Sequence, residues 1–144
     1  MGSACALTWL CPHTPNCKTC SQGKPEERVK HVERAIAAEI GDERFLPFLT
    51  LHEFEALLLV DPSAVGEVVG QPKRVHCLTA AIKNTPPEEI NDTAHNHPSA
   101  LIRRCFPEYN KTVHGLRIAK QIGLAAIRSA CPHFNEWVTA LEQL

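Results

Sequence analysis

The first candidates for chemistry are the carboxylates Glu53 and Glu55 and the neighbouring His52, which stand at the start of an apolar segment, 54–60. A helical wheel places apolar side chains on nearly every side of this segment, so the helix predicted over 50–60 is expected to be buried. A buried carboxylate is costly unless it is paired, hydrogen-bonded or bound to a metal. We therefore predict Glu55 and Glu53 as catalytic residues. Glu55 and His52, three positions apart on one side of the helix, are predicted as metal ligands.

Each carboxylate also has a plain structural interpretation. Thr50 and Glu53 have the three-residue spacing of a capping box, in which the Glu53 side chain accepts a hydrogen bond from the Thr50 amide. Glu55 falls in the first turn of the predicted helix, where a negative charge interacts favourably with the helix dipole. The sequence leaves both alternatives open.

Charge is unevenly distributed along the chain, although the formal net charge is only -1. Residues 25–92 contain seven Lys and Arg against thirteen Asp and Glu, whereas residues 93–135 contain six against one. In the basic part, Lys111, His114 and Arg117 are predicted to bind phosphate, which makes DNA a candidate partner. The alternative is that these charges form surface salt bridges or only solvate helix faces. The overall balance excludes a globally basic nucleic-acid coat protein.

The chain has seven cysteines, an odd number and too few for a disulfide scaffold, so we predict thiols or metal ligands rather than disulfides. The four N-terminal ones are Cys5, Cys11, Cys17 and Cys20. Only one pair among them has the C-x2-C spacing of a zinc site, which disfavours zinc. The other three, Cys77, Cys105 and Cys131, are predicted to be small buried hydrophobic side chains.

The elements that position these residues are predicted to be mostly helices. Residues 1–24 are expected to be irregular and 25–40 to form a helix that Gly41 ends. Asp61, followed by a proline, is expected to cap a further helix. Segment 45–50 is predicted to be one buried strand. Because a lone strand leaves its backbone groups unpaired, we expect a partner chain or an absent part of the domain to supply more strands.

Four segments taken together resemble one bacterial protein family. They are L-H-E-F-E-A-L-L at 51–58, Y-N-K at 109–111, I-G-L at 122–124 and C-P-H-F at 131–134. This set resembles domain-of-unknown-function family 4276, which has a Toprim-like fold. The resemblance implies an α/β fold, in which this chain is the helix-rich C-terminal portion of a Toprim-like domain with few strands. It further implies an N-terminally truncated member, with residues 1–24 irregular and 25–144 forming a single truncated domain.

The resemblance also implies a function. Toprim-like domains bind Mg²⁺ through acidic residues, so the chain resembles a Mg²⁺-dependent nuclease or phosphodiesterase acting on DNA, of a family often encoded beside ATPases and connected with defence. The strands that carry the Toprim acidic residues precede the portion present here, so we expect the fragment to be inactive. The alternative is a non-enzymatic interaction module that docks on a partner such as an ATPase. No segment approaches the roughly 20 apolar residues of a membrane helix, and the expected location is cytoplasmic.

Overall fold

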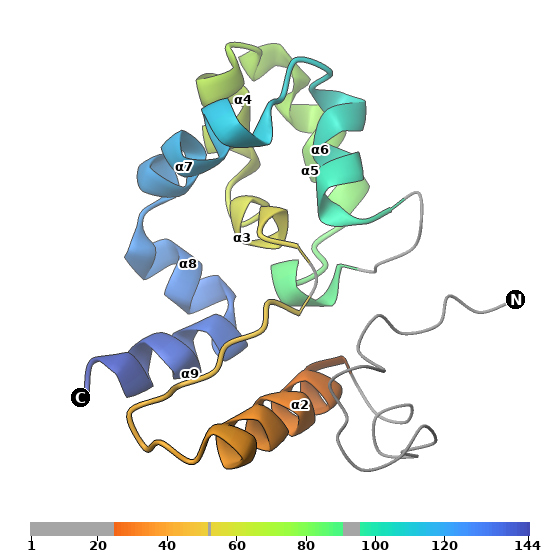
Figure 1. Cartoon of the computed structure of the whole chain (residues 1–144). Helices are drawn as coiled ribbons and strands as arrows, with labels where there is room; N and C mark the ends of the chain where they lie inside the picture. Colours follow the sequence, from red (N-terminus) through yellow and green to blue (C-terminus); the bar gives the residue numbers. More distant parts are fainter. Residues whose placement is uncertain (1–24, 52, 91–95) are drawn as a thin grey trace, which may run out of the picture. The chain divides into compact units, whose positions relative to one another are not determined.

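The computed structural model describes residues 25–51, 53–90 and 96–144, and these residues form helices joined by turns and irregular segments. The helices are α2 (Pro25–Ile40), α3 (Glu55–Leu58), α4 (Pro62–Val69), α5 (Val75–Ile82), α6 (Pro98–Cys105), α7 (Lys111–Ile122), α8 (Leu124–Ala130) and α9 (Pro132–Leu141), with short 3₁₀ turns η2 (Pro72–Arg74) and η3 (Pro87–Glu89) (Figure 1). They divide into two compact units. The first contains α2, the segment that follows it to residue 51, and residues 137–144; the second contains residues 53–136.

The prediction of an α/β, Toprim-like fold is wrong, because the described residues contain no strand. Segment 45–50, predicted to be a strand, is irregular, and side chains rather than a neighbouring strand satisfy part of its backbone. The Leu49 amide donates to Glu33 Oε1 over 2.7 Å, and the Leu46 carbonyl accepts from Trp137 Nε1 over 3.1 Å. The segment therefore needs no additional strands to satisfy these two groups.

The first unit is organised around α2, which confirms the helix predicted over 25–40. Gly41 ends it with a φ of +66°, a left-handed conformation that glycine adopts without steric cost. Val29 and Val32, three positions apart, are buried on one side of the helix. The rings of Phe48 and Trp137 stack with their centroids 4.7 Å apart. The first unit thus contains an amphipathic helix with a buried apolar side and one stacked aromatic pair.

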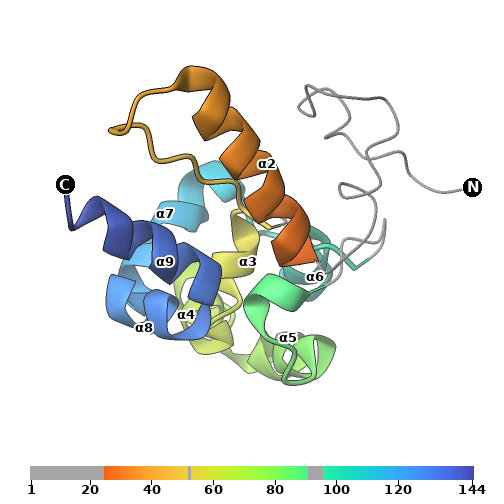
Figure 2. The ribbon, with the colours of Figure 1, turned by 90° about the horizontal axis from the view of Figure 1, so that it is seen from below.

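The second unit is built around α3, which lies at its centre in both views (Figures 1 and 2). Helix α3 contacts α6, α7 and η3, while α4 contacts α5 and α7. The largest fully buried apolar side chains of the second unit come from helices α3 to α7 and the turns between them. They are Leu58, Leu59, Val65, Leu78, Ile102, Phe106 and Ile118. Burial of apolar surface on this scale is the main source of stability for such a unit.

Helix α3 is shorter than predicted, covering only 55–58 of the expected 50–60. The helix cannot continue through Asp61, because the backbone of Asp61 is extended. The Asp61 side chain accepts hydrogen bonds from the Ser63 and Ala64 amides and so caps α4. That cap confirms the helix start predicted at Asp61. The predicted burial of the segment is also confirmed, since Glu55, Ala56, Leu57, Leu58 and Leu59 are all buried.

Two further helix starts depend on polar side chains. Asn110 caps α7 by accepting from the Thr112 amide at 3.0 Å and the Val113 amide at 3.2 Å. Helix α9 has no such residue before it, and Glu88 of η3 supplies the acceptor: its carboxylate accepts from the amides of His133 and Phe134. A carboxylate at a helix N-terminus is stabilising, because it also complements the helix dipole.

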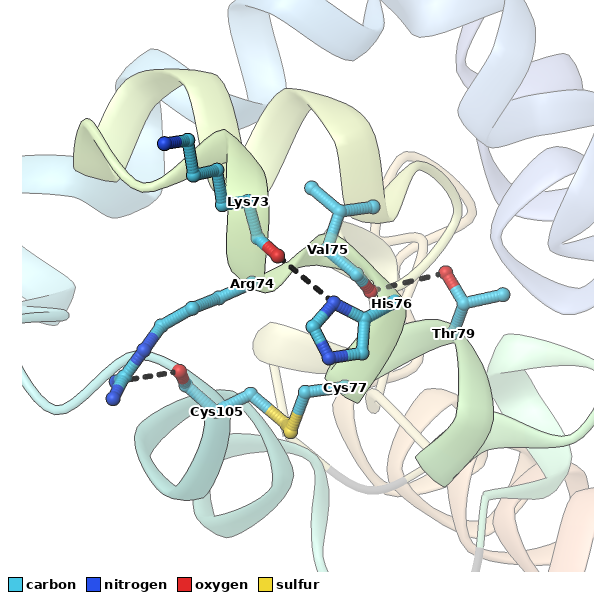
Figure 3. The surroundings of a disulfide bond; sticks show 7 residues. All are labelled: Lys73, Arg74, Val75, His76, Cys77, Thr79 and Cys105. Atoms are coloured by element: carbon cyan, nitrogen blue, oxygen red, sulfur yellow. Dashed lines mark hydrogen bonds between the residues drawn. A yellow bond between two sulfur atoms is a disulfide. The ribbon is translucent and has the colours of Figure 1, made fainter.

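A disulfide joins Cys77 of α5 to Cys105 of α6, with the Cα atoms 5.7 Å apart (Figure 3). The prediction that all cysteines are thiols or metal ligands is therefore wrong for this pair. Residues 28 positions apart in the sequence meet because α5 and α6 pack together. Cys131 is free and fully buried, as predicted, and Cys5, Cys11, Cys17 and Cys20 lie outside the described residues.

Candidate functional site

Glu55 is the first residue of α3 and is completely buried. Its Oε2 accepts from Lys111 Nζ at 2.9 Å, and its Oε1 accepts from the Tyr109 hydroxyl at 3.4 Å. Lys111 is the first residue of α7 and is half-exposed. Its ammonium also lies 5.9 Å from the centroid of the Phe54 ring, within cation–π range. The buried negative charge is therefore compensated by a lysine that reaches it from the surface.

Tyr109 serves this pair as a neutral donor. Burial, followed by the negative charge of Glu55, raises the pKa of Tyr109 well above its ordinary value. The phenol therefore keeps its proton at any physiological pH and can donate to Glu55 throughout. Gly115 of α7 lies against the same group: a Cβ built there would be 3.3 Å from Phe54 Cε1 and 3.7 Å from the Tyr109 hydroxyl. The absence of a side chain at 115 lets α7 approach this closely.

Glu53 has partners other than the predicted Thr50, and they lie 44 and 46 positions away in the sequence. Its Oε2 accepts from the Ser99 amide at 2.8 Å, its Oε1 accepts from the Ser99 hydroxyl at 3.1 Å, and His97 Nδ1 lies 3.2 Å from Oε2. Glu53 thus caps the first turn of α6, where His97 supplies no side-chain cap. The predicted capping box with Thr50 is wrong, because the helix begins at Glu55.

The electrostatics of Glu53 follow from these contacts. Partial burial raises its pKa, but hydrogen bonds from the Ser99 amide, His97 and the Ser99 hydroxyl together outweigh burial, so the pKa lies below its ordinary value. A depressed pKa means that the folded state stabilises the ionised carboxylate.

Replacing Glu53 by glutamine is expected to lower stability at neutral pH and to flatten its dependence on acid. The contribution of the carboxylate is fully present above the ordinary pKa of 4.5 and is lost as the pH falls through the lower folded-state value. Urea unfolding midpoints of the wild type and Glu53→Gln, measured between pH 7 and pH 3, should converge at the acid end. Glu108→Gln removes an exposed carboxylate and serves as the control. Parallel curves for the wild type and Glu53→Gln would contradict this account.

The three residues predicted to bind phosphate all lie on α7 but do not form one cluster. Lys111 is paired with Glu55, and His114 Nδ1 accepts from the Asn110 amide at 2.9 Å. Arg117 is exposed and makes no salt bridge with the described part of the chain. At three-residue spacing, each of the three is rotated about 60° further round the helix. The geometry therefore gives two of them structural roles and leaves Arg117 available.

The acidic residues do not fit a magnesium site in this arrangement. Each carboxylate oxygen of Glu53 and Glu55 already accepts a hydrogen bond, and the Lys111 ammonium occupies the position beside Glu55 that a cation would need. His52 lies outside the described residues. Within the described ranges, no three or more His, Cys, Asp or Glu side chains gather closely enough to hold a metal ion. Magnesium binding stays a prediction.

The outward side of α7 combines apolar and basic side chains, and we call it the α7 outer surface. Val113 and Leu116 are exposed by 53% and 62%, and Leu124 at the start of α8 by 52%. Arg117 and Lys120 lie on the same side of α7 as Val113 and Leu116, since positions 113, 116, 117 and 120 fall within about 100° of the helical wheel. Neither α7 nor α8 contains an acidic residue.

The comparisons with known proteins give one result. A family model described as a domain of unknown function, DUF4276, matches residues 7–142. The chain belongs to this family. A search of curated proteins finds no match, and a search of solved structures finds none either. Among the described helices of this DUF4276 member, none has both the length and the apolar character that crossing a membrane requires.

Sequence reasoning missed the partners of both glutamates. Ser99 lies in no recognised motif, and the Y-N-K segment that contains Tyr109 gave no hint of its partner, because these roles depend on contacts 46 and 54 positions away in the chain. One local signal was present for Ser99: helix α6 begins at Pro98 without a capping residue before it, so its first amides need an acceptor from elsewhere.

Proposed function

We propose that this DUF4276 domain is a non-enzymatic interaction module that docks on a protein partner through the α7 outer surface. The observation that carries the proposal is the exposed pair Val113 and Leu116 on one face of α7 beside Arg117 and Lys120, with Leu124 also exposed at the start of α8. Exposed apolar side chains grouped with charges are characteristic of protein interfaces, whose centres are apolar and whose rims are polar.

The charges define the chemistry of the partner. Arg117 and Lys120 have no salt-bridge partner among the described residues, and no carboxylate lies on α7 or α8 to neutralise them. The complementary surface is therefore an apolar patch bordered by carboxylates. A second copy of this chain docked on the same surface would place these like charges against each other, which disfavours a symmetric dimer.

A protein partner explains the surface better than a nucleic acid does. Phosphate contacts use basic and polar side chains, and exposed leucines contribute nothing to them. The family resemblance makes an ATPase encoded beside the gene the first partner to examine. The nuclease hypothesis has no observation in its favour here, because both predicted catalytic glutamates are engaged in structural contacts.

If an ATPase is the partner, Leu116→Glu is expected to weaken the complex with it about tenfold or more. The substitution places a carboxylate in the apolar centre of the surface, opposite the carboxylates of the partner. Because Leu116 is exposed, folding stability should change by no more than about 0.5 kcal/mol. Co-expression followed by size-exclusion chromatography and titration calorimetry measures the complex.

Ala38→Glu provides the matched control, since it adds the same charge at an exposed position of α2. It should leave the complex intact. The proposal fails if Leu116→Glu binds as the wild type does, or if the ATPase does not bind at all. Duplex DNA binding that Arg117→Glu abolishes and Leu116→Glu leaves unchanged would identify a nucleic-acid surface instead.

A further inference from the structure

The two cysteines of the Cys77–Cys105 disulfide differ in exposure. Cys105 is only 2% exposed, whereas Cys77 is partly exposed and lines a surface cavity of about 600 Å³. Figure 3 shows the bond linking α5 to α6, with Arg74 reaching across to the backbone of Cys105. An incoming nucleophile can therefore reach Cys77 from the cavity, while Cys105 is shielded by protein.

The described lining of the cavity carries a net positive charge. Among the described residues, Lys83 and Arg104 line it together with one carboxylate, Glu89. All three residues are exposed, and none of them forms a salt bridge with another described residue. Two cations against one anion favour a small ligand that carries at least one net negative charge.

We propose that Cys77 is a thiol–disulfide exchange site whose cavity binds a small anionic thiol. Cys77 belongs both to the disulfide and to the lining of the cavity. The site lies on α5 and α6 and is independent of the docking function proposed for α7.

The exchange proceeds in two balanced steps. The ligand thiolate attacks Sγ of Cys77, a new sulfur–sulfur bond forms, and the Cys77–Cys105 bond breaks with its electron pair on Cys105, which takes up a proton from solvent. A second thiolate then attacks the ligand sulfur of the mixed disulfide. This releases the ligand disulfide and leaves Cys77 reduced. Two thiols are oxidised in total, and one protein disulfide is reduced.

Arg74 supports the departure of Cys105. Cys105 is the last residue of α6, where the helix dipole disfavours a negative charge. The Arg74 guanidinium donates to the Cys105 carbonyl at 3.1 Å and so places a positive charge at this helix end. A thiolate that forms there is compensated, which makes Cys105 a better leaving group.

The test compares two small thiols on the oxidised full-length chain. Reduced glutathione is anionic, and cysteamine is cationic; rates are expressed per thiolate. Glutathione is expected to form a mixed disulfide on Cys77, located by peptide mass spectrometry, about fivefold faster than cysteamine. The Lys83→Gln, Arg104→Gln double variant should lose this preference. Arg117→Gln, Lys120→Gln removes the same charge away from the cavity and should keep it.

Several outcomes would overturn the proposal. They are adducts on Cys105 instead of Cys77, equal rates for the two thiols, and a preference that survives in Lys83→Gln, Arg104→Gln. Alkylation of Cys77 and Cys105 before any reductant is added would show that the bond does not form. Cys131 monitors the fold during the experiment: burial raises the pKa of its thiol to about 12, so it resists alkylation while the protein is folded.

Discussion

Replacing Lys111 by methionine is expected to lower the free energy of unfolding by about 3 kcal/mol. Glu55 is completely buried, and Lys111 is its counter-charge at 2.9 Å. Methionine keeps most of the apolar stem of lysine but leaves the carboxylate without a cation. Removing one partner of a buried pair typically costs about 3–5 kcal/mol, and we expect the lower end because the Lys111 side chain is half-exposed. Urea unfolding at pH 7 measures the loss.

Two further variants separate charge from packing. Glu55→Gln combined with Lys111→Met removes both charges and should recover much of the lost stability, because a neutral amide is less costly to bury than an ion. Lys120→Met makes the same substitution at an exposed position of α7 and should change the free energy of unfolding by less than about 0.5 kcal/mol. A Lys111→Met protein as stable as Lys120→Met would show that Glu55 does not depend on this ammonium.

Removing the disulfide is expected to have a comparable effect. The Cys77→Ala, Cys105→Ala variant should lose about 3.5 kcal/mol of unfolding free energy, the chain-entropy value for a cross-link that closes a loop of this length. The two cysteines are 28 positions apart, and the bond restricts the unfolded chain between them. Urea unfolding with and without a reducing agent gives the measurement.

The reducing agent provides an internal check on this value. It should lower the stability of the wild type to that of the double alanine variant and should leave the variant unchanged. A wild type that unfolds at the same urea concentration in both conditions would mean that the bond contributes no stability. A loss much larger than 3.5 kcal/mol would point instead to packing damage around Cys105, which is nearly fully buried.

The helices that the sequence predicted well are those with local start and stop signals. Gly41 ends α2, and Asp61 begins α4. These signals act within one turn of chain, so the sequence contains all the information they need. The segment 45–50 lacked such signals. Its apolar character is equally consistent with a strand or a buried irregular segment, and its backbone partners, Glu33 and Trp137, are distant in the sequence.

The candidate site was predictable only up to the burial of Glu55. A helical segment with apolar side chains on nearly every side correctly indicated that the Glu55 carboxylate is buried and must be paired, hydrogen-bonded or bound to a metal. The sequence could not show that the cation is the ammonium of Lys111, 56 positions later, because tertiary packing brings α3 and α7 together. The disulfide was missed for the same reason: an odd cysteine count argued against cross-links, while the packing of α5 on α6 decides which sulfurs meet.

The distance along the chain between Glu55 and Lys111 also bears on when this unit can fold during synthesis. A growing polypeptide whose last residue precedes Lys111 contains the acidic side chain but not its counter-charge, so closing the interior around Glu55 at that stage carries the full cost of an isolated ion. Helix α7 must leave the ribosome before Glu55 can be buried without the free-energy cost of an unpaired charge. We therefore expect this unit to fold after its last third, which contains α7, has been translated.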